Sequence, residues 1–169
     1  SHSAYYFSDD SISVVRQAYL TNPFPEAKII GAEIRKRSRP GDQMIIFGAE
    51  PELLVAAGLP SATGHIFPYH TVDGQPYNER FQQQMLSDLN KKMPRYVVVY
   101  TNGTSWMATD LVHANAFLAR LSIPVFQNPA YRRIGVVDIF KNGQIYKWDR
   151  ELDGFKPSSG AQIWIYEIP

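Results

Sequence analysis

Hydrophobic residues recur at helical spacing in several stretches of this chain, which predicts amphipathic helices. The predicted helices lie around residues 12–19, 27–39, 51–57, 77–92 and 109–121. The segment Asn22-Pro23-Phe24-Pro25 separates the first two, because proline interrupts a helix, and Pro40-Gly41 marks a turn after the second.

Two short runs, Met44–Phe47 and Tyr96–Tyr100, are apolar at every position. Such runs are typical of strands buried on both faces, as in parallel sheets covered by helices. The C-terminal part has a different pattern. Segments 133–140 and 144–148 flank Asn142-Gly143, a dipeptide that favours tight hairpin turns, and residues 161–168 alternate between apolar and more polar positions.

The order helix, strand, helix, strand, helix, followed by antiparallel strands, predicts an α/β fold. We expect a single Rossmann-like open sandwich with a mostly parallel central sheet and a C-terminal antiparallel hairpin. No linker divides the sequence, so residues 1–169 are expected to form one domain.

Composition narrows the possible functions. The 169 residues carry a formal net charge of +1 and no concentrated basic face is evident, so no nucleic-acid partner is expected. The chain has no cysteine, which excludes disulfides, thiol catalysis and cysteine-based zinc sites. No apolar run approaches the roughly 20 residues that span a bilayer.

Open α/β sheets bind ligands beyond the carboxyl ends of their strands, and two such positions carry polar residues. Glu50 follows the first predicted strand, and Asn102 follows the second. Neither turn contains the Gly-x-Gly-x-x-Gly motif of dinucleotide sites, and no Walker loop is present, so no cofactor is expected. Glu50 could accept hydrogen bonds from sugar hydroxyls, or it could simply favour the adjacent helix N-terminus.

Histidine and aromatic residues in predicted loops are further candidates for ligand binding. His65 and His70 are five residues apart, a spacing that suits neither one helix face nor one side of a strand, so no metal site is expected. Tyr69 and Trp106 are aromatic rings in predicted loops, where they could stack on the apolar face of a sugar or rest against a membrane interface, although such rings more often pack in or beside the core. The predicted site residues are therefore Glu50, His65, Tyr69, His70, Asn102 and Trp106.

A longer pattern over roughly residues 26–101 resembles the soluble region of a family of membrane enzymes. The matching segments are Pro40-Gly41-Asp42, Met44–Phe47, Gly48–Leu54, Leu59–Tyr69, Arg80-Phe81 and Pro94–Val99. They resemble the polyprenyl-phosphate-sugar-dependent glycosyltransferases, which include dolichyl-phosphate-mannose protein mannosyltransferases and lipid-A aminoarabinose transferases. Leu54 stands where that family often has tyrosine.

The resemblance implies that the chain is the C-terminal soluble domain of an integral membrane enzyme, on its extracytoplasmic (periplasmic) face. In this family the catalytic carboxylates lie in loops between transmembrane helices, so no catalytic residue is expected here. The implied role is non-catalytic: acceptor or glycan binding, or stabilisation of the parent enzyme, with the transmembrane portion of the parent chain as partner.

An alternative is a free-standing domain that binds a nucleotide-like small molecule or transfers a group from it. That alternative requires a pocket near Gly48, Glu50 and residues 101–105 with donors for a phosphate or ribose.

Overall fold

The computed structural model describes residues 14–16, 19–67, 71, 76–102 and 127–169. Their helices and strands follow one another in the order α3 (Phe24–Arg37), β1 (Met44–Phe47), α4 (Glu52–Ala57), α5 (Asn78–Lys91), β2 (Tyr96–Tyr100), β3 (Arg132–Phe140), β4 (Gly143–Trp148), the 3₁₀ helix η3 (Asp149–Leu152) and β5 (Ala161–Glu167). The predicted helix at 109–121 lies outside the described residues. No helix in the described ranges combines the length and apolarity needed to cross a membrane.

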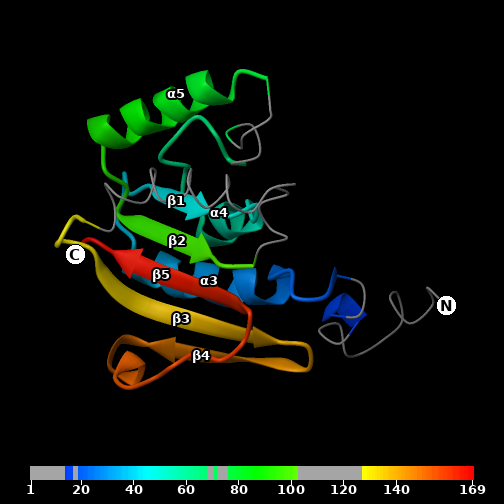
Figure 1. The fold of residues 1–169 in the computed structure, drawn as a ribbon. Coiled ribbons are helices and arrows are strands. Elements are labelled where there is room, and N and C mark those ends of the chain that lie inside the picture. The colour runs from blue at the N-terminus through cyan, green and yellow to red at the C-terminus, as the bar shows by residue number, and fades with distance from the viewer. Residues whose placement is uncertain (1–13, 17–18, 68–70, 72–75, 103–126) are drawn as a thin grey trace.

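The five strands form one mixed sheet in the order β1-β2-β5-β3-β4 (Figure 1). Only β1 and β2 are parallel, while β2–β5, β5–β3 and β3–β4 are antiparallel. The predicted mostly parallel, Rossmann-like sheet is therefore wrong. The apolar runs of β1 and β2 do indicate burial on both faces, but burial on both faces does not fix strand direction.

The C-terminal hairpin is present. Phe140 pairs with Gly143, so the two-residue loop is Lys141-Asn142, one position earlier than the predicted Asn-Gly turn. The strand β5 then returns between β2 and β3, pairing with both. Its alternation is confirmed: Ile163 and Ile165 are fully buried, while Trp164 and Tyr166 on the other face are partly exposed.

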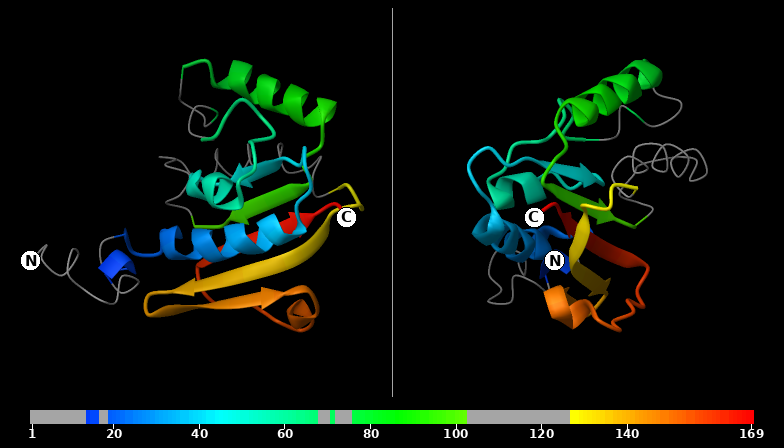
Figure 2. Two further views of the ribbon diagram at one scale, coloured as in Figure 1. Left: turned by 180° about the vertical axis from the view of Figure 1, so that it is seen from behind. Right: turned by 90° about the vertical axis from the view of Figure 1, so that its left-hand side faces the viewer.

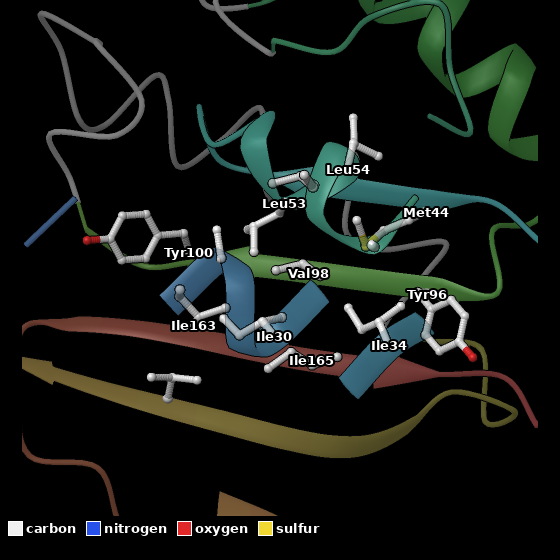
Figure 3. Close-up of a cluster of buried hydrophobic side chains, with 14 of the residues drawn as sticks. Ile30, Ile34, Met44, Leu53, Leu54, Tyr96, Val98, Tyr100, Ile163 and Ile165 are labelled. Atoms are coloured by element: carbon white, nitrogen blue, oxygen red, sulfur yellow. The ribbon is translucent and has the colours of Figure 1, made fainter. Parts of the chain in front are cut away.

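Side chains from both faces of the sheet form two cores. One lies between the sheet and the helices α3 and α4, where Ile30, Leu53, Val98 and Ile165 converge (Figure 3). On the other face, Phe47 and Val97 belong to a cluster with Met85 and Leu89 of α5. Figure 2 shows α3 and α4 together on one side of the sheet.

Helices α3 and α4 approach each other closely at a glycine. A Cβ atom built on Gly31 would lie 2.4 Å from the backbone carbon of Ala56, closer than any real contact. The helix α4 ends at Gly58, whose φ of 67° lies in the left-handed region that glycine adopts without strain. This close packing fixes α4, and therefore the turn that leads into it from β1.

Candidate functional site

The parallel pair β1 and β2 places two predicted site residues at the same edge of the sheet. Glu50 lies three residues beyond the end of β1, and Asn102 two beyond the end of β2. Both line one cavity of about 380 Å³, here named the polar pocket. The described residues that line the polar pocket are Tyr19, Leu20, Thr21, Asn22, Glu50, Tyr100 and Asn102.

A hydrogen-bonded group forms one side of the polar pocket. The Tyr100 hydroxyl, at the end of β2, donates to the backbone carbonyl of Thr21 at 2.6 Å. The Asn102 amide donates to the Thr21 hydroxyl at 2.9 Å and to the Tyr100 hydroxyl at 3.3 Å. Tyr100 lies at the margin of the core cluster, and its ring projects away from the strand (Figure 3). These contacts hold residues 19–22 against the strand ends.

Glu50 contributes a buried carboxylate, with only 1% of its surface exposed. The turn before it explains this position, because a Cβ atom on Gly48 would lie 2.1 Å from Glu50 Oε2. Glycine at position 48 therefore leaves room for the carboxylate to fold back over the strand end. Burial raises the pKa of the Tyr100 hydroxyl, and the nearby Glu50 charge raises it further. Tyr100 consequently stays protonated and remains a hydrogen-bond donor at neutral pH.

Segment 19–22, which lines the polar pocket, is also held by Arg16, and Arg16 forms a buried ion pair with Glu26. Arg16 also donates to the carbonyls of Leu20 at 3.3 Å and Asn22 at 3.2 Å. The Asn22 side-chain oxygen is buried and accepts no hydrogen bond from any described residue.

Of the remaining predicted site residues, the structure describes His65 alone, and it lies apart from this group. His65 packs edge-to-face on Phe81 of α5, with ring centroids 5.2 Å apart, and does not line the polar pocket. Tyr69, His70 and Trp106 lie outside the described residues. Within the described part of the chain, no three histidine or carboxylate side chains are grouped to hold a metal ion.

Sequence patterns missed Tyr19 and Asn22, and they missed the Arg16–Glu26 pair. The one local signal was the Asn-Pro break at 22–23, which places a polar side chain between two helices. No spacing rule connects that break to the end of β2, about 80 residues further along the chain.

No protein-family model, curated protein or solved structure matches this chain. The resemblance to membrane glycosyltransferases therefore depends on the sequence segments quoted above.

The lining of the polar pocket favours some ligands over others. It offers a carboxylate, two side-chain amides, a threonine and two tyrosines, and no lysine or arginine is among its described lining residues. Among these described lining residues, a phosphate group would meet the Glu50 carboxylate and no cation. Neutral hydroxyl groups, in contrast, can donate to the carboxylate without adding a second negative charge.

A second hollow, here named the apolar groove, lies between α3 and α4 and measures about 500 Å³. It is lined by Phe24, Ala27, Lys28, Ala32, Arg35, Glu52, Val55 and Ala56. Glu52 is the acidic residue of this lining, and its Oε1 atom is buried with no hydrogen-bond partner among the described residues. Burial raises the pKa of the Glu52 carboxyl group, although a backbone hydrogen bond partly opposes the shift.

Replacing Glu52 with glutamine is therefore expected to stabilise the protein at neutral pH. A raised folded-state pKa means that the native state binds the proton more tightly than the unfolded state, so wild-type stability falls as the pH rises through the range above about 4.3. The gain of Glu52→Gln should be greatest at pH 7 and disappear below about pH 4. Thermal melts of both proteins from pH 3 to pH 8 measure it. Glu79→Gln, in the exposed first turn of α5, is the matched control; an equal gain there would contradict burial as the cause.

Proposed function

We propose that this chain is a non-catalytic accessory domain of a membrane glycosyltransferase, and that it binds a sugar in the polar pocket. The observation that supports sugar binding is the lining of this pocket. Glu50, Asn22 and Asn102 surround a cavity of about 380 Å³ at the carboxyl ends of the only parallel strand pair among the described strands. A pocket at this place in an open sheet is a common position for ligands.

The donors and acceptors suit a polyhydroxyl ligand. Carboxylate and amide oxygens accept from sugar hydroxyls, and the Asn102 amide and Tyr100 hydroxyl are already held in place by Thr21. Tyr19, which is half exposed at the rim, offers an aromatic face on which an apolar sugar face can stack. Because these groups are fixed before the ligand arrives, little ordering entropy is lost on binding.

The same lining argues against catalysis in this domain. Enzymes that cleave glycosidic bonds commonly place two carboxyl groups about 5–9.5 Å apart on either side of the bond. Glu50 is the single carboxylate among the described residues that line the polar pocket. No described residue of this lining supplies the cation that the nucleotide-like alternative would require, so we favour a neutral sugar over a nucleotide.

The resemblance to polyprenyl-phosphate-sugar-dependent enzymes supports the proposed parent protein. In that arrangement the domain lies on the extracytoplasmic, periplasmic face, and its partner is the transmembrane portion of its own chain. The reading frame upstream of Ser1 tests this part of the proposal. Several apolar segments of spanning length, with acidic residues in the first outer loop, would support it, and a frame without such segments would exclude it.

Sugar binding is tested by titrating the ¹⁵N-labelled chain with methyl glycosides of common hexoses, followed by amide chemical shifts. We expect at least one glycoside to shift the amides around Glu50 and Asn102 with a dissociation constant on the order of 1 mM. Asn102→Ala should weaken that binding roughly tenfold, because it removes an amide that organises the pocket. No turnover of glycosides is expected.

Two controls separate the polar pocket from general effects. Asn90→Ala changes an exposed residue of α5 and should leave affinity unaltered. A parallel titration with nucleotides and S-adenosylmethionine should give no shifts at the polar pocket. If nucleotides bind there and no glycoside does, the proposed sugar-binding function is wrong.

A further inference from the structure

The polar pocket and the apolar groove lie on either side of one aromatic pair. Tyr19 lines the pocket and Phe24 lines the groove, and their rings meet edge-to-face with centroids 5.2 Å apart. The turn that precedes α4 also contributes to both hollows, because Glu50 lines the pocket and Glu52 lines the groove. A single ligand can therefore reach both hollows by crossing this pair of rings.

The groove is an exposed apolar surface next to a polar site. Phe24 is 44% exposed and Val55 is 79% exposed, while alanines from both helices contribute to the lining between them. Leu20, which lines the neighbouring pocket, is also largely exposed. Large apolar side chains gathered in this way often mark an interaction site.

The direction of the groove is set by α3. Phe24 begins this helix, and Arg35 lies eleven residues further on, where it donates to the carbonyls of Ala56 and Ala57 at the end of α4. The helices α3 and α4 lie next to each other on one side of the sheet (Figure 2). Eleven residues correspond to roughly 16 Å along the helix axis, which is long enough for an extended alkyl chain.

We propose that the ligand of this domain is amphipathic: a neutral saccharide in the polar pocket, joined to an apolar aglycone that lies in the apolar groove. This inference rests on the proposed sugar-binding function and specifies its ligand class. The link between the two parts crosses the Tyr19–Phe24 pair beside Glu50 and Glu52. The Glu50 carboxylate, with no lysine or arginine among the described residues that line the polar pocket, disfavours a phosphate next to the saccharide, so the ligand is a simple glycoside and not a sugar phosphodiester.

The test compares methyl and octyl glycosides of the same sugar, with the octyl compound kept below its critical micelle concentration. Burial of the alkyl chain should tighten binding at least tenfold, since each methylene group that leaves water adds to the favourable binding free energy. Additional amide shifts are expected at Phe24 and Val55. Val55→Asn should bring the ratio of the two affinities toward one, and Ile145→Asn, an exposed apolar residue on β4, should leave that ratio intact.

Each failure has a distinct meaning. Equal affinities for the two glycosides, with binding at the pocket intact, would overturn the amphipathic ligand but leave the sugar-binding function standing. If the octyl glycoside still binds more tightly than the methyl glycoside in Val55→Asn, the alkyl chain is adsorbed elsewhere on the protein, and the inference is also overturned. Octyl phosphate that binds the groove as tightly as the octyl glycoside would overturn the neutral link. If neither glycoside binds, the proposed function fails, and this inference fails with it.

Discussion

Replacing Glu26 with alanine is expected to destabilise the protein by about 3–5 kcal/mol, because it leaves the Arg16 charge buried without its partner. Arg16 is 7% exposed and Glu26 is 0% exposed, so water cannot compensate for the lost carboxylate. Burial already lowers the pKa of Arg16. Chemical denaturation of the wild type and variant, analysed by linear extrapolation, measures the change in unfolding free energy.

The pair should also show strong non-additivity. Substituting Arg16→Met and Glu26→Leu together removes both charges, so the double variant should be much more stable than either single variant. Lys91→Met breaks an exposed pair with Asp88 and should leave stability almost unchanged. A double variant as unstable as the sum of the two single variants would show that the buried pair is not the source of the effect.

Loss of the ion pair should also affect the polar pocket. Arg16 holds the carbonyls of Leu20 and Asn22, which belong to the wall of that pocket. The Arg16→Met/Glu26→Leu protein is therefore expected to fold but to bind methyl glycosides more weakly than the wild type. The ion pair thereby connects the stability of segment 19–22 with ligand binding.

Replacing Gly31 with alanine is expected to destabilise the protein by about 1–3 kcal/mol. In a helix interior, alanine is normally more favourable than glycine by about 1 kcal/mol. A loss of stability on this substitution in the middle of α3 would therefore run against the intrinsic helix preference. The reason is the contact with α4, where the new Cβ atom would lie 2.4 Å from the Ala56 backbone carbon and 2.5 Å from its Cβ. Backbone on a neighbouring helix cannot move aside as a flexible side chain can.

Gly160→Ala provides the matched control for this substitution. No atom lies within 4 Å of a Cβ built on Gly160, so this variant should be neutral or slightly stabilising. Thermal melts compare the two variants directly. A Gly31→Ala protein that melts with or above the wild type would show that α3 and α4 separate easily, and that the apolar groove between them is not rigid.

Local elements of this fold could be predicted from the sequence, but their arrangement could not. The strands Met44–Phe47 and Tyr96–Tyr100 are found where their apolar runs predict them. Both are buried on two faces, and that burial suggested a parallel sheet. The prediction failed at β5, which the chain inserts between β2 and β3, because the pairing of distant strands leaves no local trace in the sequence.

The candidate site likewise has residues that could be predicted from the sequence and residues that could not. Glu50 and Asn102 could be predicted to lie near each other because parallel strands end at the same edge of a sheet. Tyr19 and Asn22 could not be predicted, since residues 19–22 reach that edge through tertiary contacts with Tyr100 and Asn102. His65 was a candidate by residue type alone, and its neighbour is the Phe81 ring.

The position of β5 has a consequence for synthesis of the protein. It is the last strand in the chain but the central strand of the sheet, between the β1–β2 pair and the β3–β4 hairpin. Until residues 161–167 leave the ribosome, these two halves have no shared neighbour, and β2 and β3 each expose an unpaired edge. Closure of the sheet is therefore a late, long-range event, which slows folding and leaves the nascent chain open to aggregation.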